Sequence, residues 1–455
     1  MNLRRGTTQH ADARTTADAL RQRTFIDLFA GCGGLSLGLM QAGWAGLFAV
    51  ERSPDAFKTL RHNLIDKNPC RPISAKFAWP HWLPKEPIEI GEFLSLHAEE
   101  LSGLRGKVTL VAGGPPCQGF SFAGRRQADD PRNQLFRKHL DLVDILRPEV
   151  VFLENVQGIS IAHGRKQWLE GGRRGRPRKS YAEKIKQMLD QHGYEPQQVL
   201  VRACDFGVPQ YRPRYLTVGI RRDLLVGRQV PSFLDTLMAL RKEFLKERGL
   251  PIDSFVNVAE AISDLCVQGK AQIACQDPES PAGFFQISYI GPESDYQRLM
   301  HSSLNGHPLN SLRLPRHRPS TVKMFQRILA TCRKGVQLSE SDRKRLGIKK
   351  TAIVPLDPDQ PSHTLTTLPD DLLHYDEPRI HTVREHARLQ SFPDWFDFRG
   401  KYTTGGDRRI RECPRYTQVG NAVPPLLAEA VGKAILKLIA DLRLAPSGAV
   451  PVHGG

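Results

Sequence analysis

A thiol in a loop is the first residue of this sequence whose type and setting suit chemistry. Cys117 stands in the stretch GGPPCQGFS, which spans residues 113–121. Glycine tolerates unusual backbone angles and proline fixes its own, so this stretch predicts a shaped loop rather than the interior of a helix or strand. A thiol on such a loop is a candidate nucleophile. The alternative is an ordinary turn that carries a half-buried structural cysteine.

An acid and two arginines stand in two other short stretches. Glu154 lies in ENV at the end of an apolar run, and Arg212 and Arg214 lie in QYRPR where another run begins. If these strand ends share one edge of a sheet, the acid, the arginines and Cys117 converge on one crevice. Taken singly, ENV is also typical of a helix cap, and alternating arginines are also typical of a solvated strand edge.

A glycine turn after an apolar run indicates a cofactor site. Gly31, Gly33 and Ser36 give the spacing G-x-G-x-x-S, which departs from the full dinucleotide fingerprint and makes a nicotinamide cofactor a weak interpretation. Glu51 ends the next apolar run, twenty residues beyond Gly31, where an acid can accept hydrogen bonds from ribose hydroxyls. The pattern predicts a nucleoside cofactor without identifying it, and a simple tight turn is the alternative.

The segments that must position these residues alternate between strand and helix patterns. Apolar runs in FIDL, GLFAVE, VTLVAGG, EVVFLEN and RYLTVGI predict strands, and helical patterns such as LFRKHLDLVDIL stand between them. This alternation predicts an α/β fold with a doubly wound, mostly parallel sheet.

The alternation fails after residue 222. Residues 223–378 mix a charged helix, basic runs and proline-broken pieces, which predicts a smaller, irregular inserted domain with a basic surface. Helical patterns return at residues 383–392 and 424–442. The predicted parts are a flexible tail at 1–22, a main domain at 23–222 and 379–442, the inserted domain at 223–378 and a second tail at 443–455.

The composition indicates a polyanionic partner. Lys and Arg number 65 against 48 Asp and Glu, which leaves a net charge of +17 and favours nucleic acid, although a merely soluble basic surface is the alternative. The eight cysteines form no C-x-x-C pair or close Cys/His group, so we expect no metal. No signal peptide or long apolar run is evident, so we expect a cytoplasmic protein without membrane contact.

Six stretches, in this order, resemble the motifs of DNA (cytosine-5)-methyltransferases. They are FIDLFAGCGGLSLGL, GGPPCQGFSFAG, ENV, QYRPR, RIHTVREHARLQSFPDWF and QVGNAVPP. The resemblance spans most of residues 25–222 and 379–440, and the region between them stands where this family has its target-recognition domain. It implies a Rossmann-like class I methyltransferase domain, S-adenosylmethionine as the cofactor and double-stranded DNA as the substrate.

The resemblance also implies catalytic roles. Carbon 5 of cytosine is a poor nucleophile, so the family adds a cysteine thiolate to carbon 6, and the activated carbon 5 then attacks the methyl group of the cofactor. Cys117 would be that nucleophile. Glu154 would hydrogen-bond ring nitrogen 3 and the exocyclic amine of the base, and Arg212 and Arg214 would orient the base and help to hold Glu154.

The cofactor pocket follows from the same resemblance. The positions that match it are Phe29, Gly31, Gly33, Glu51, Pro116, Leu135 and Asn421. One departure concerns the Asp-Ile pair that the family uses at the adenine ring, which is not visible within KEPIEIGEFLSLHAEEL. Glu92 is the candidate substitute there.

Two further stretches bear on DNA, whose target base must be flipped out of the duplex before a thiol can reach carbon 6. Residues 363–366, HTLT, resemble the end of the target-recognition domain. Residues 173–179, RRGRPRK, contain the Arg-Gly-Arg-Pro core of AT-hook segments. Our hypothesis is that they grip the backbone or the minor groove, and a solvated loop is the alternative.

Other functions are weighed against this one. A tRNA cytosine-5 methyltransferase is disfavoured because its short Cys-Phe-Thr stretch is absent and the basic insert is large. A catalytically silent DNA-binding relative is disfavoured by the intact Cys117, Glu154 and arginine pair, and an NAD-dependent dehydrogenase is more distant still. The lack of long regulatory domains favours a prokaryotic restriction-modification or phage-defence setting, with a cognate restriction or defence complex as a partner.

Overall fold

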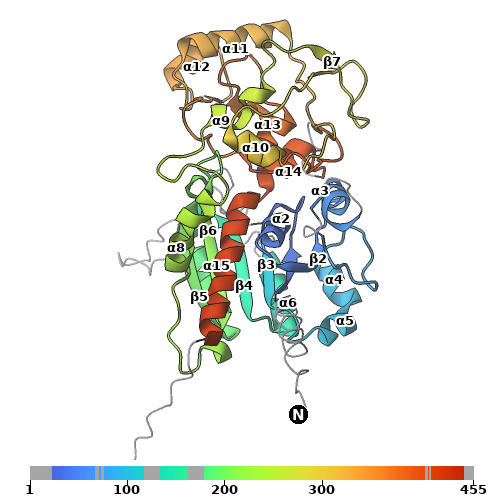
Figure 1. Cartoon of the computed structure of the whole chain (residues 1–455), viewed down its shortest axis with the longest axis vertical. Coiled ribbons are helices and arrows are strands. Elements are labelled where there is room, and N and C mark those ends of the chain that lie inside the picture. The colour runs from blue at the N-terminus through green and yellow to red at the C-terminus, as the bar shows by residue number, and fades with distance from the viewer. Residues whose placement is uncertain are drawn as a thin grey trace, which may run out of the picture.

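The chain forms two lobes in the computed structural model of Figure 1, a lower lobe around a twisted sheet and an upper lobe of short helices. The structure describes residues 23–66, 71–72, 76–116, 134–161, 179–404, 408 and 411–444. Cys117, residues 173–178 of the basic tract, the predicted N-terminal tail and nearly all of the predicted C-terminal tail lie outside the described residues.

The lower lobe contains a six-stranded sheet. Its strands, in spatial order, are β2 (Ala45–Val50), β1 (Thr24–Leu28), β3 (Leu110–Gly113), β4 (Val150–Val156), β6 (Pro213–Arg221) and β5 (Tyr194–Arg202). The pairs among β2, β1, β3 and β4 are parallel, and β6 is antiparallel to both of its neighbours. The predicted α/β class with a mostly parallel sheet is therefore confirmed, and β5 is a strand that the sequence analysis did not predict.

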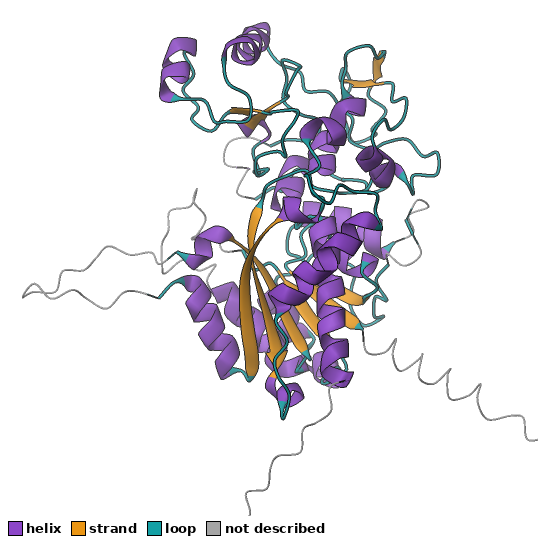
Figure 2. Ribbon diagram, turned by 60° about the vertical axis from the view of Figure 1, so that its left-hand side comes forward, coloured by secondary structure: helices purple, strands orange, loops and turns teal. Residues whose placement is uncertain are grey.

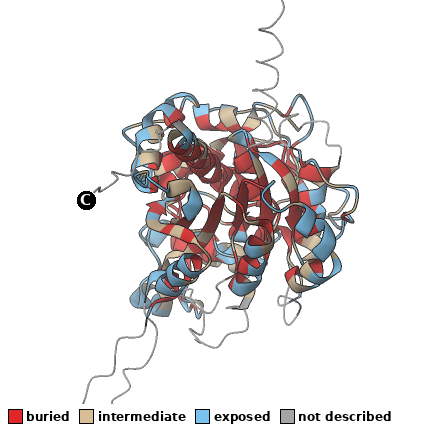
Figure 3. Cartoon of the chain, turned by 90° about the horizontal axis from the view of Figure 1, so that it is seen from below, coloured by how far each residue is buried: buried red, intermediate tan, exposed pale blue. Residues whose placement is uncertain are grey.

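Helices cover both faces of this sheet (Figure 2). One face carries α2 (Gly34–Gln41), α8 (Phe233–Lys246) and α15 (Pro425–Leu444), and the other carries α4 (Ile90–Leu96), α5 (Ala98–Gly103), α6 (Gln134–Leu146) and α7 (Tyr181–Gln191). Each face forms its own apolar core, and the buried strands lie between them (Figure 3). Burial on both faces explains why β1, β3 and β4 appear in the sequence as short apolar runs.

Close packing fixes α2 against α15. A Cβ atom at Gly38 would overlap the carbonyl oxygen of Pro425 and the side chain of Ala428, and a Cβ atom at Gly34 would overlap the carbonyl oxygen of Val423. Only glycine permits this backbone approach. The helix that follows the cofactor turn is therefore held directly against the C-terminal helix, although the two are almost 400 residues apart in the sequence.

The upper lobe is built from short elements. They are α9 (Val258–Ile262), α10 (Asp295–His301), α11 (Pro319–Thr331), α12 (Glu340–Leu346), α13 (Val383–Leu389), α14 (Arg415–Asn421), the hairpin β7 (Gln272–Ala274) with β8 (Phe285–Ile287), and the pair β9 (Val354–Pro355) with β10 (Leu372–Leu373). The buried guanidinium of Arg388 pairs with Asp394 at 2.5 Å and with Asp264 at 3.2 Å. The pair with Asp264 attaches α13 to the segment that follows α9.

Segments that lie far apart in the sequence pack together within each lobe. Helix α8 packs beside α15 in the lower lobe, where Lys433 lies 2.8 Å from Glu247. Helix α13 packs against α9 in the upper lobe. Each of the predicted parts 223–378 and 379–442 therefore contributes helices to both lobes. The reason is that the apolar face of each helix packs against a helix that lies far away in the sequence.

Candidate active site

Glu154 and Arg214 form an ion pair where β4 and β6 meet. The Arg214 Nε atom lies 2.5 Å from Glu154 Oε1, and both side chains are largely buried. The antiparallel register pairs Val156 with Arg214, so Glu154 lies on the same face of the sheet as Arg214, one diagonal step away. Burial lowers the pKa of Arg214, and the carboxylate of Glu154 offsets part of that shift. The structure thus joins two of the predicted catalytic residues.

The chain before Cys117 leads toward this ion pair. A Cβ atom at Gly114 would come within 3.4 Å of Glu154 Oε2, so the strand β3 ends beside the carboxylate. Pro116, a predicted cofactor residue, follows and is half-buried. Cys117 itself is outside the described residues, so its place as the nucleophile stays a prediction.

Arg212 has different neighbours from Arg214. Its Nη2 atom donates to the carbonyl oxygens of Gly420 and Ala422, each at 2.9 Å, and its Nη1 atom donates to the carbonyl oxygen of Leu365 at 3.2 Å. Within the described residues these contacts tie Arg212 to the upper lobe and to the start of α15, while Glu154 is paired with Arg214.

The predicted cofactor turn adopts backbone angles that suit glycine. Gly31 and Gly33 have φ values of 57° and 99°, and Phe29 also has a positive φ of 60°. The backbone N–H of Gly31 donates to Glu51 Oε2 at 2.8 Å, and the N–H of Ser53 donates to Glu51 Oε1 at 2.7 Å. Burial raises the pKa of Glu51, and these two N–H donors oppose that shift. The turn and the acid that the sequence predicted as partners are therefore in direct contact.

Asp27 is a titratable residue beside this turn that the sequence analysis missed. Its Oδ2 atom accepts a hydrogen bond from Ser36 at 2.5 Å, and its Oδ1 atom is buried without a hydrogen-bond partner. Burial, the largest cause, and the charge of Glu51 raise the pKa of Asp27 to about 7. An acid inside the apolar run FIDL was the available signal, because a buried carboxyl needs a reason to be retained.

The remaining predicted residues lie at the margins of the same region. Asn421 ends α14 and is exposed, and Leu135 is half-buried near the start of α6. Glu92 is exposed in the first turn of α4. By contrast, the backbone N–H of Ile88 donates to the carbonyl oxygen of Glu51 at 2.9 Å. The segment at Ile88 is therefore joined by its backbone to Glu51, the acid that holds the cofactor turn.

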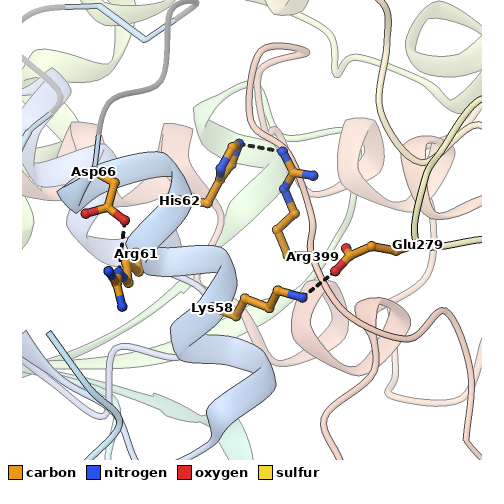
Figure 4. Close-up of a pocket in the computed structure, with 6 residues that line it drawn as sticks. All are labelled: Lys58, Arg61, His62, Asp66, Glu279 and Arg399. Carbon is orange, nitrogen blue, oxygen red and sulfur yellow. Dashed lines mark hydrogen bonds and ion pairs between the residues drawn. The ribbon is translucent and has the colours of Figure 1, made fainter.

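A hollow of about 490 Å³ lies between α3 (Pro54–Leu60) and the upper lobe (Figure 4). Its lining residues are Lys58, Arg61, His62, Asp66, Glu279 and Arg399. Lys58 pairs with Glu279, and Arg399 donates to the imidazole of His62 at 2.9 Å. Because these charged groups are paired across the hollow, we interpret it as the joint between the lobes.

A second hollow lies beside the QYRPR segment. It measures about 260 Å³, and its lining includes Tyr211, Arg333, Lys334 and His363. The Tyr211 hydroxyl donates to Gln360 at 3.0 Å. Asp357 also lines the hollow, and among the described residues neither Arg333 nor Lys334 forms an ion pair. This hollow therefore presents positive charge next to the strand that carries Arg214.

Two searches of the described residues gave no candidates. Within the ranges stated above, no group of three or more His, Cys, Asp or Glu side chains could hold a metal ion. Over the same ranges, no helix is both long enough and apolar enough to cross a membrane.

Comparison with known proteins gives one consistent result. The family model of the C-5 cytosine-specific DNA methylases matches residues 23–437. The Type II methyltransferase M.DdeI of Desulfomicrobium norvegicum is 28% identical over 92% of this chain and 90% of its own length. The Type II methyltransferase M.Eco47II of Escherichia coli is 30% identical over 91% of this chain and 79% of its own length.

One solved structure shares the fold. It is a prophage-encoded protein from E. coli that is described as a DNA modification methyltransferase, and it superposes with a TM-score of 0.57. The match covers 92% of this chain and 99% of that one at 23% sequence identity. This likeness supports the architecture of both lobes together.

Proposed function

The chain belongs to the C-5 cytosine-specific DNA methylase family and is a DNA cytosine-5 methyltransferase, and we propose that it acts through a covalent cysteine adduct at the site around Glu154. The observation that carries this proposal is the buried ion pair of Glu154 with Arg214 beside the end of β3. A carboxylate in that position faces the chain that leads to Cys117.

The proposed reaction needs one nucleophile and one acid. The thiolate of Cys117 adds to carbon 6 of a flipped cytosine, while Glu154 hydrogen-bonds ring nitrogen 3 and the exocyclic amine and stabilises the charge that develops on the ring. Carbon 5 would then form a bond to the methyl carbon that bound S-adenosylmethionine supplies, and the cofactor's sulfur would keep the electrons of the broken bond. Loss of the carbon 5 proton to a base expels the Cys117 thiolate and restores the aromatic ring.

Arg214 supports this reaction by holding the acid. Its guanidinium fixes one oxygen of Glu154 at 2.5 Å, which leaves the other oxygen toward Gly114. Because the carboxylate is already oriented, its side chain loses no further conformational entropy when the base binds. We assign Arg214 to the pocket of the target cytosine on this ground.

The family and the fold imply the use of S-adenosylmethionine, and the residues at the glycine turn fit that cofactor. Both oxygens of Glu51 are held by backbone N–H groups, and a carboxylate retains acceptor capacity for ribose hydroxyls. A Cβ atom at Gly31 would meet no atom within 4 Å, so the turn is open on that side. When bound, the cofactor supplies an electrophilic methyl group on its sulfonium. Phe29, Gly33, Pro116, Leu135 and Asn421 complete the proposed pocket.

DNA is the proposed substrate, and the hollow beside Tyr211 is a candidate contact with its backbone. Arg333 and Lys334 lie in the upper lobe next to the segment of Arg214, and Asp357 is the one acid among the described residues that line this hollow. A phosphate near the target base would be drawn to this charge. The net charge of +17 also attracts the negatively charged DNA over longer distances.

We place the enzyme in a restriction-modification or phage-defence system. This setting rests on the relatives, of which M.DdeI and M.Eco47II are named Type II methyltransferases. A cognate restriction enzyme or defence complex is the partner that such a setting implies.

The test is conversion-based sequencing of DNA from cells that express the wild type or Cys117→Ala. We expect 5-methylcytosine in one sequence context with the wild type and none with the variant. Methylation that persists in Cys117→Ala would overturn the covalent mechanism. Methylation of tRNA with none in DNA would favour the RNA-modifying alternative, and cofactor binding without methylation of either would favour a silent DNA-binding relative.

A further inference from the structure

The guanidinium of Arg212 is buried in a setting of carbonyl oxygens. The residue is 2% exposed and has a φ of 23°. Its donors reach Gly420, Ala422 and Leu365 through their carbonyl oxygens at 2.9–3.2 Å, and the Nη1 atom also reaches Gln210 Oε1 at 3.3 Å. Among the described residues no acid forms an ion pair with Arg212, and Glu154 forms its ion pair with Arg214 instead.

The guanidinium of Arg212 lies at the C-terminal end of helix α14. Gly420 stands in the last turn of α14, and Ala422 follows that helix, so both carbonyl oxygens belong to its negative end. Burial and the nearby charge of Arg214 lower the pKa of Arg212, and the charge of Glu154 opposes that shift. The side chain therefore fixes the exit of α14 in place.

The segment that Arg212 fixes lies directly against the cofactor turn. A Cβ atom at Gly34 would overlap the carbonyl oxygen of Val423, and it would lie 3.3 Å from the side chain of Ala422. The Cys32 thiol donates to the carbonyl oxygen of Gln418 at 3.6 Å. Residues 418–423 thus form a wall along the turn that carries Gly31 and Gly33.

Two glutamines hold the same wall from the other side. Gln390 donates through Nε2 to the carbonyl oxygen of Ala422 at 2.5 Å, and it accepts from Gln210 Nε2 at 2.5 Å. Gln210 Oε1 in turn accepts from the backbone N–H of Leu365 at 2.9 Å. The carbonyl of Ala422 therefore has two donors, of which Arg212 is the charged one.

We propose that Arg212 is a positioning residue for the cofactor pocket, which it serves by holding the wall 418–423, with Asn421, against the glycine turn. Its neighbour Arg214 acts on Glu154 and the target base. The two arginines of this motif thus have separate roles, Arg212 at the cofactor pocket and Arg214 at the pocket of the target cytosine. The inference rests on the proposed function in one respect, that S-adenosylmethionine binds at the glycine turn.

The test compares Arg212→Lys with Arg214→Lys in the full chain. Lysine keeps the charge but cannot reach three carbonyl oxygens with a planar fork. For Arg212→Lys we expect the Kd for S-adenosylmethionine, measured by calorimetry without DNA, to rise about tenfold or more. The KM for the cofactor should rise in parallel, with kcat at saturating cofactor within about threefold of wild type. Arg214→Lys should give the opposite pattern, a lower kcat with unchanged cofactor affinity.

Each result bears on the proposal. A lower kcat with wild-type cofactor affinity in Arg212→Lys would assign Arg212 to the base pocket and overturn it, and so would wild-type behaviour in both measurements. If Arg212→Lys does not fold by circular dichroism, Gln390→Met is the second variant. It removes the second donor to the carbonyl of Ala422 and, with it, the acceptor of the Gln210 amide. It should raise the same Kd about threefold, and an unchanged Kd overturns the proposal. A wild-type chain that binds no S-adenosylmethionine would instead contradict the proposed function.

Discussion

The Nε atom of Arg214 lies 2.5 Å from Oε1 of Glu154, across the antiparallel junction of β6 with β4. Each partner satisfies a charge that burial would otherwise leave uncompensated. The pair also sets the direction of the free carboxylate oxygen, which lies toward Gly114 and the start of the Cys117 loop. We therefore expect the chemistry of the site to depend on both residues of this pair.

We predict that Glu154→Gln lowers kcat for DNA methylation by about 10²- to 10⁴-fold. An amide has the shape of the carboxylate but carries no charge, so it stabilises the protonated ring poorly and leaves Arg214 without its partner. Calorimetry should find cofactor affinity within about twofold of wild type. A loss of cofactor affinity as large as the loss of kcat would contradict the assignment of Glu154 to the base pocket.

We predict that Gly34→Ala destabilises the chain by about 1–3 kcal/mol, since the added methyl group overlaps the carbonyl oxygen of Val423. Urea unfolding checks this value. The matched control is Gly103→Ala at the end of α5, where an added Cβ meets no atom within 4 Å. The control should be neutral, and equal losses in both variants would contradict the close packing of α2 on residues 422–429.

Acid should destabilise the fold between pH 7 and pH 5, and His139 should carry part of the effect. Burial lowers the pKa of His139 from 6.5 to about 3, and neither ring nitrogen has a hydrogen-bond partner. Below pH 6.5 the imidazole of His139 is protonated in the unfolded chain but stays neutral in the folded chain. The free energy of unfolding therefore falls as the pH falls. We estimate about 2 kcal/mol for this residue over that window.

The measurement is urea unfolding of the wild type and His139→Phe at pH 7, 6 and 5. The variant should lose about 2 kcal/mol less than the wild type over this window. Asp27, whose raised pKa of about 7 acts in the opposite direction, contributes equally to both chains. Parallel pH profiles would show that His139 does not titrate on unfolding in this window.

We predict that Arg333→Ala with Lys334→Ala weakens DNA binding and lowers the slope of log affinity against log salt by about 2, since each cation releases about one counterion from DNA. The two side chains line the hollow beside Tyr211. The control is Lys437→Ala on α15, whose ammonium pairs with Asp441 at 3.3 Å. A slope that changes equally in the control, or in neither protein, would exclude this hollow as a phosphate contact.

The sequence by itself determined the local units of this fold. Strands β1, β2, β3, β4 and β6 and the turn with Gly31 and Gly33 were predicted, because apolar runs and glycines act over a few residues. The sequence paired Gly31 with Glu51 only as two parts of one cofactor site, and the structure adds the hydrogen bond between them. Strand β5 was missed because it is an edge strand that contains Pro196 and a Gln-Gln pair and shows no clear apolar alternation.

Only the tertiary structure decided how the two arginines divide. In an extended strand, residues two apart point to the same side, which predicts that Arg212 and Arg214 converge. Strand β6 begins at Pro213, and the positive φ of Arg212 turns its side chain away, toward Gly420 and Ala422. Those carbonyls lie about 200 residues further along the chain, so no local pattern encodes them. Local spacing and the family resemblance therefore supplied the candidate residues of the site, and long-range packing determined which of them lie in contact.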